Sequence, residues 1–165
     1  MQLDFTVVFS YWQVLAKGLA LTLAFTVSCA VLGSVFGFLL SLLRLSKNRF
    51  ISIPTGLYVE LFRGTPLLIQ LFWIFFCLPV VFGISVPPYV SVMLALTLYM
   101  TAITSETFRG ALKSIPSEQH DACTALGVAK WNKVLYVIFP QALLRAVPPL
   151  LSNVVSLFKE SALIS

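Results

Sequence analysis

One short segment of the chain gathers side chains that could do chemistry. His120 stands beside Asp121, and Cys123 follows two positions later. An imidazole, a carboxylate and a thiol can bind a metal or support nucleophilic catalysis. The chain has one histidine, however, which without further ligands does not complete a zinc site, and one adjacent His-Asp pair does not define a catalytic triad. We therefore predict no metal, no cofactor and no catalytic residue, and interpret the segment as a polar helix surface; a membrane-embedded enzyme using His120 and Asp121 is the more remote alternative.

A second group of polar side chains lies in an otherwise apolar segment: Asn153, Lys159 and Glu160. If this segment lies in a membrane, its ionisable groups are costly and therefore indicate a functional site. Lys159 and Glu160 carry opposite charges and would lower one another's desolvation cost. Because Asn153 and Lys159 do not share a helix face, we expect irregular backbone after Pro148-Pro149. The alternative is a span that ends near Asn153, with the pair at the membrane interface.

The composition indicates that these residues are held by membrane helices. Of the 165 residues, 59% are hydrophobic and only 10% are charged, whereas soluble domains carry about 25% charged residues. The mean hydropathy is +0.96. A soluble enzyme, a disordered chain and a secreted disulfide scaffold are excluded. The net charge of +5 is scattered between apolar runs rather than gathered on one face, so no nucleic acid partner is expected.

Charge-free runs predict where the chain crosses the membrane, since about 20 apolar residues span the hydrocarbon core. The prolines and glycine between residues 79 and 88 predict a turn. Gly33 and Gly37 form a GxxxG pattern that lets another helix approach closely, either within the chain or in a dimer. We predict an all-α, multi-pass membrane protein with four spans: 18–43, 66–82, 88–106 and 134–158.

Lysine and arginine predict the orientation. Eight of the eleven basic residues fall in the stretches 44–63 and 106–133, and none falls in the turn 79–90. Because basic loops remain in the cytoplasm, both stretches are expected inside and the N-terminus outside. The first span is expected to be retained, since its apolar run is longer than that of a cleaved signal peptide.

The second basic stretch also predicts a short helix. Pro116 and Ser117 provide a start, with Ser117 as the N-cap, and Gly127 provides a stop. The helix of about nine residues would show Ala122, Ala125 and Leu126 on one face. Such a helix is marginal by itself in water. It either docks into a groove of another protein or rests on its own spans.

The spacing of this segment resembles the EAA loop of permease subunits in ABC importers. That family pattern reads Glu-Ala-Ala, three residues, Gly, nine residues, Ile, one residue, Leu-Pro. Here the matching residues are Asp121-Ala122-Cys123, Leu126-Gly127 and Val137-Ile138-Phe139-Pro140. The spacing is kept, while Asp121 replaces Glu, Cys123 replaces Ala, and Val137 and Phe139 replace Ile and Leu.

Further motifs resemble the polar amino acid uptake branch of this family, whose members carry substrates such as histidine, glutamate, glutamine, arginine and opines. They are the stretch from Tyr58 to Phe72, Glu106-Thr-Phe-Arg-Gly, Ser114-Ile-Pro, Pro140-Gln-Ala-Leu-Leu-Arg, Pro148-Pro-Leu and Lys159-Glu160-Ser161.

The resemblance implies a single permease domain over residues 1–165 in the bacterial inner membrane, with a coupling loop at 107–133. Its partners would be a cytoplasmic ATP-binding subunit, which hydrolyses ATP in place of this chain, a second permease subunit, identical or paralogous, an extracytoplasmic amino-acid-binding protein, and membrane lipid. The residues expected to dock the ATP-binding subunit are Asp121, Ala122, Cys123, Ala125, Leu126, Gly127 and Pro140.

The resemblance also implies that Asn153, Lys159 and Glu160 line the substrate pathway, because the family's corresponding Lys-Asp/Glu pair sits near the membrane interior. The group offers both an acceptor for the ammonium and a donor for the carboxylate of a polar amino acid. The family continues into a fifth helix, so four of its five helices are expected in this sequence. The rival interpretation is an inactive truncated permease or a structural membrane protein.

Overall fold

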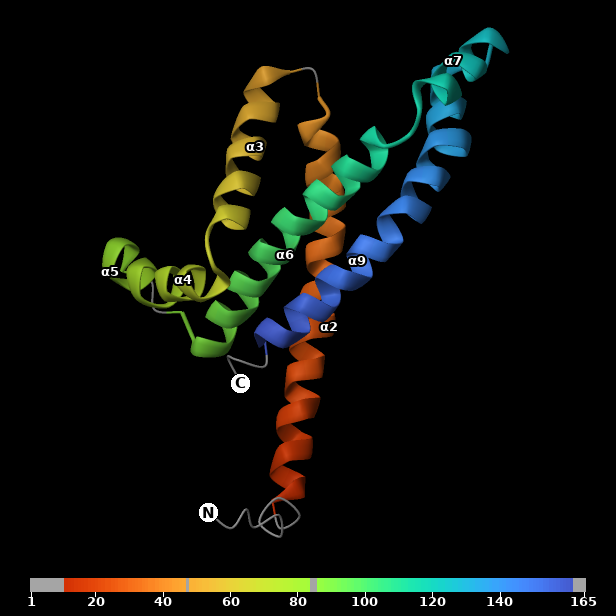
Figure 1. Ribbon diagram of the computed structural model, residues 1–165. Coiled ribbons are helices and arrows are strands. Elements are labelled where there is room, and N and C mark those ends of the chain that lie inside the picture. Colours follow the sequence, from red (N-terminus) through yellow and green to blue (C-terminus); the bar gives the residue numbers. More distant parts are fainter. Residues whose placement is uncertain (1–10, 47, 84–85, 162–165) are drawn as a thin grey trace.

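The computed structural model describes residues 11–46, 48–83 and 86–161, and these residues form helices and connections without a strand. This confirms the all-α prediction. The longest helix, α2, covers Trp12–Arg44, extending the predicted span 18–43 at its N-terminal end. Its 33 residues rise about 50 Å, more than the hydrocarbon core requires. Figure 1 shows α6 (Pro88–Lys113) and α9 (Phe139–Ser161) crossing α2 obliquely.

The segment predicted as a basic loop at 44–63 is largely a helix, and this expectation was wrong. Helix α3 covers Arg49–Gly64, and the Asn48 side chain caps it by accepting a hydrogen bond from the Phe50 N–H at 3.0 Å. The Tyr58 hydroxyl donates to the Leu98 carbonyl of α6 at 2.8 Å. Arg44, at the end of α2, and Arg49 and Arg63, in α3, therefore belong to helices rather than to a loop.

The predicted span 66–82 is the second half of a bent pair. After α3 the chain forms α4 (Leu67–Phe72), the π-helix η1 (Trp73–Cys77) and α5 (Leu78–Phe82). The axis turns by 109° between 49–64 and 67–82. Within the described ranges, three helical stretches are long and apolar enough to cross a membrane, or four if the bent pair counts as one span.

The glycine pair of α2 packs against α6 of the same chain. A Cβ on Gly33 would lie 2.6 Å from Cβ of Met100, and one on Gly37 would lie 2.7 Å from Cβ of Thr104. Neither distance is compatible with an undisturbed side chain, so the two helices approach at these glycines as closely as their backbones allow. The predicted close approach is confirmed, and the partner helix within the chain is α6.

The last helical stretch runs from residue 130 to 161 through α8 (Lys130–Asn132), the π-helix η2 (Lys133–Ile138) and α9. The irregular backbone expected after Pro148-Pro149 is absent from it, because α9 continues through both prolines to Ser161. Two missing N–H donors cost two hydrogen bonds but do not end this helix. The widened turns are those of η2, which precede Pro140, and α9 is helical past Asn153 to Ser161.

Candidate functional site

The short helix predicted in the second basic stretch is α7, which covers Ser117–Ala125. Gly127 adopts φ +68°. Its N–H bonds to the Thr124 carbonyl and the Val128 N–H bonds to the Cys123 carbonyl, each at 3.0 Å. This is a Schellman motif, so Gly127 ends the helix as predicted. The Ser117 N-cap was wrong: Pro116 occupies that position in extended conformation, and Ser117 begins the helix without a capping bond.

Helix α7 exposes the small apolar face expected from the sequence. Ala122, Ala125 and Leu126 are exposed, with Leu126 at 80%, whereas Cys123 is turned toward its own chain and is 6% exposed. Figure 1 shows α7 at one extremity of the molecule, beyond the ends of α3 and α6. The helix therefore presents Ala122, Ala125 and Leu126 outward at the tip.

Two basic side chains of the helical stretch 130–161 bind α7 and the connection that precedes it. The Lys133 ammonium, in η2, donates to the His120 carbonyl at 2.8 Å and to the Thr124 hydroxyl at 3.1 Å. The Arg145 guanidinium, in α9, donates to the Ser114 carbonyl and hydroxyl. These bonds to Ser114, in the connection that leads into α7, explain why an arginine occurs in this apolar segment.

Three guanidinium groups surround Glu106 of α6. Arg44 of α2 donates to Oε2 at 2.6 Å, and Arg109 bonds to both carboxylate oxygens. Arg63 at the end of α3 lies 3.8 Å from Oε2. We call these four residues the Glu106 cluster. It joins α2, α3 and α6, and it has more positive than negative charge.

The sequence reading missed the Glu106 cluster because it assigned the arginines to loops. One local signal was available: Glu106 ends a long charge-free run and Arg109 follows three positions later, which is the spacing of a helical ion pair. Nothing in the spacing indicated that Arg44 and Arg63 join them.

Arg63 also lines two cavities whose walls include charged and polar side chains. The first, of about 450 Å³, is bounded by residues 63–68 together with Tyr99 and Glu160; we call it the Glu160 cavity. The second, of about 410 Å³, includes Arg63, Glu106, Arg145 and Asn153. The Glu160 cavity therefore has a guanidinium and a carboxylate among its lining groups.

Within α9, Asn153 and Glu160 share a face and Lys159 does not. The Asn153 amide donates to the Thr107 hydroxyl of α6 at 3.0 Å, and Glu160 Oε1 accepts from the Tyr99 hydroxyl of α6 at 3.2 Å. The second carboxylate oxygen of Glu160 is buried and has no hydrogen-bond partner among the described residues.

The predicted pairing of Lys159 with Glu160 is not found in the described part of the chain, where the ion pairs all involve Glu106. Lys159 is exposed. Successive residues of a helix point about 100° apart, so Lys159 turns away when Glu160 faces α6. Asn153 and Glu160 were predicted as pathway residues and remain a prediction. Tyr99 and Arg63, which line the same cavities from other helices, were not predicted.

Residues 32–165 match the family model described as "Binding-protein-dependent transport system inner membrane component". The chain is 34% identical over 156 residues to the L-cystine transport system permease protein TcyB of Bacillus subtilis, covering 94% of this chain and 66% of that protein. It is 35% identical over 151 residues to a putative glutamine transport system permease protein GlnP of Rickettsia conorii, covering 92% of this chain and 69% of that protein.

A solved structure described as an amino acid ABC transporter with histidines has the same fold. The TM-score is 0.93 at 30% identity, over 99% of this chain and 76% of that chain. The chain thus spans 66% and 69% of the length of the two permease relatives and 76% of the length of the solved chain.

Proposed function

Because the chain belongs to the family of binding-protein-dependent transport system inner membrane components, we propose that it is the permease subunit of an ATP-driven importer for polar amino acids. It would act with a separate ATP-binding subunit, a second permease subunit and an extracytoplasmic binding protein. Relatives named for L-cystine and for glutamine support the amino acid class.

The observation that carries this proposal is the Glu160 cavity, where Arg63 and Glu160 line one space among mostly apolar helices. A zwitterionic amino acid requires an anion for its ammonium and a cation for its carboxylate. Glu160 has a buried carboxylate oxygen without a described partner, and such a group costs free energy until it is hydrogen-bonded. A substrate ammonium would satisfy it, while Arg63 would bind the carboxylate.

In this arrangement Arg63 takes the role that the sequence reading gave to Lys159. Asn153 lines the neighbouring cavity, which shares Arg63. We propose that the two cavities are successive parts of the substrate pathway, with Arg63 between them.

We further propose that α7 docks on the ATP-binding subunit through its exposed face of Ala122, Ala125 and Leu126. Asp121 lies on the exposed surface of the same helix, while Cys123 packs inward. Lys133 and Arg145 tie α7 to the stretch that continues as α9. Movement of the ATP-binding subunit would then pass through α7 to the helix that carries Glu160, opening the cavity alternately to either side.

Uptake in the full importer tests the pathway. Glu160→Gln removes the anion at nearly constant volume, and we expect uptake to fall about tenfold or more, the loss of one charge-assisted hydrogen bond. Lys159→Gln is the matched control, since it removes an exposed charge one position away, and it should transport normally. Co-purification with the ATP-binding subunit should be unchanged for both. Normal uptake by Glu160→Gln would show that Glu160 does not bind the substrate on the pathway.

A further inference from the structure

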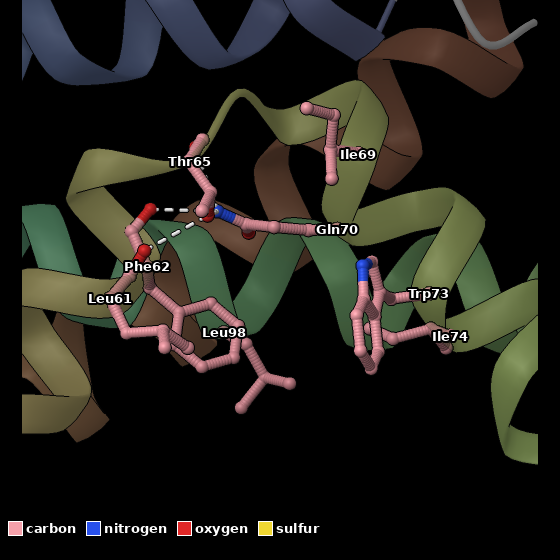
Figure 2. A pocket seen from close by; sticks show the side chains of 8 residues that line it. All are labelled: Leu61, Phe62, Thr65, Ile69, Gln70, Trp73, Ile74 and Leu98. Atoms are coloured by element: carbon pink, nitrogen blue, oxygen red, sulfur yellow. Dashed lines mark hydrogen bonds between the residues drawn. The ribbon is translucent and has the colours of Figure 1, made fainter. Parts of the chain in front are cut away.

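The bend between α3 and α4 is held by one side chain, Gln70. Its amide nitrogen donates to the Phe62 carbonyl at 2.7 Å, to the Thr65 carbonyl at 3.0 Å and to the Thr65 hydroxyl at 2.9 Å. Figure 2 shows the amide reaching from α4 across the bend to Phe62 and Thr65. Gln70 is 6% exposed. The two carbonyl acceptors fix which end of the amide is the NH2 group, because a carbonyl cannot donate.

These bonds satisfy backbone groups that the bend would otherwise leave unpaired. Pro66 has no N–H, and the residue before a proline avoids helical conformation; Thr65 is accordingly extended, at φ −108° and ψ 137°. The last carbonyls of α3 therefore lack helical partners. The Thr65 hydroxyl donates a hydrogen bond to the Leu61 carbonyl at 2.9 Å. The Gln70 amide donates to the carbonyls of Phe62 and Thr65.

The surroundings offer few substitutes for the amide. Gln70 borders a cavity of about 330 Å³ whose other lining residues, Thr65 apart, are hydrocarbon or aromatic: Leu61, Phe62, Ile69, Trp73, Ile74 and Leu98 (Figure 2). An unpaired carbonyl in apolar surroundings is costly, and non-helical backbone at membrane depth depends on such compensation.

The same bend also forms part of the wall of the Glu160 cavity, which residues 63–68 line together with Tyr99 and Glu160. We infer that Gln70 is a positioning residue for transport: by holding the bend it sets where Arg63 stands relative to Glu106 and to the substrate. The expected effect of Gln70 on substrate binding rests on the proposed function. Its expected effect on the bend rests on the geometry alone.

Gln70→Met tests the inference in the assembled importer. Methionine keeps the length and the packing volume but has no donor. The matched control is Gln141→Met on α9, where the amide makes one exposed contact, with Gln119 at 3.4 Å. Spin labels at Leu57 and Val80, which are 65% and 85% exposed, measure the distance across the bend after the native cysteines are replaced.

We expect a shifted or broadened label distance in Gln70→Met, and an apparent KM for uptake raised about five- to tenfold with the maximal rate nearly kept. Gln141→Met should leave the distance and the KM unchanged. An unchanged distance in Gln70→Met would overturn the inference. A shifted distance with an unchanged KM would overturn the positioning role.

A second variant covers the case in which Gln70→Met does not assemble. Gln70→Asn keeps the amide but is one methylene shorter, so it should produce a smaller shift and a smaller rise in KM; wild-type values for both would contradict the inference. The proposed function fails separately, if Arg63→Gln and Glu160→Gln transport normally. In that case the label distance alone decides whether Gln70 holds the bend.

Discussion

Two carboxylates on neighbouring helices of this chain have opposite surroundings. Glu106 has both oxygens engaged by Arg44 and Arg109, and Arg63 lies within 3.8 Å. Glu160 has one oxygen on the Tyr99 hydroxyl and a second, buried oxygen without a partner among the described residues. A carboxylate with both oxygens bonded to arginines from two helices holds those helices together, whereas one with an unpartnered buried oxygen has capacity for a ligand. Arg63 is the residue that lies between the two.

The largest effect is expected at Glu106. In Glu106→Gln, Arg44 and Arg109 lose their counter-ion, and the Arg44 side chain is only 12% exposed. Removing one partner of a buried ion pair costs about 3–5 kcal/mol, and the partial exposure here lowers this to about 2–3 kcal/mol. We expect a lower unfolding temperature in detergent and less assembled importer.

Glu60→Gln is the control for that experiment, because Glu60 is exposed on α3 and its substitution should leave the unfolding temperature unchanged. Glu160→Gln should also be stable. If Glu106→Gln unfolds at the wild-type temperature, or if Glu160→Gln is the less stable of the two, the contrast between a structural and a functional carboxylate is wrong.

The intermediate case is Arg63→Gln. The Arg63 side chain is 47% exposed and lies 3.8 Å from Glu106, whereas Arg44 is bonded to it at 2.6 Å. Loss of Arg63 should therefore cost little stability, about 0–1 kcal/mol. If Arg63 binds the substrate carboxylate, uptake should fall about tenfold. A variant that transports normally but unfolds early would place Arg63 in the Glu106 cluster alone.

The fold was predictable where the determinants are local. Charge-free runs located α2, α6 and α9, and the Gly127 stop of α7 follows from a backbone conformation that glycine adopts without strain. Helix α3 was missed because its arginines, Arg49 and Arg63, look like loop charges in the sequence. Arg63 of α3 and Arg44 of α2 share the partner Glu106, 62 positions from Arg44, and only packing brings the three together.

The same distinction applies to the site. Asn153 and Glu160 were predicted as pathway residues because polar groups in an apolar segment stand out. The Gly127 stop of α7 was predicted because its determinants are local, whereas the Ser117 N-cap was wrong. Lys159 was paired with Glu160 because the two are adjacent in the sequence. On a helix, adjacent side chains point about 100° apart. Tyr99, Arg63 and Gln70 were missed because their roles depend on contacts between separate helices. The orientation of the N-terminus remains a prediction from the positive-inside rule.

The smallest effect is expected at Tyr99. Tyr99→Phe removes one hydroxyl, and with it the hydrogen bond to Glu160 Oε1 at 3.2 Å. The ring and its packing remain, so the unfolding temperature should not change measurably. Because this bond orients a carboxylate that the substrate would also engage, its loss should raise the apparent KM about two- to fivefold, within the range for one such bond.

In the Glu160→Gln background the same substitution should add little, since the two residues then no longer form the charged contact. Uptake kinetics of the two single variants and the double variant measure this coupling. Fully additive losses would show that Tyr99 acts independently of Glu160.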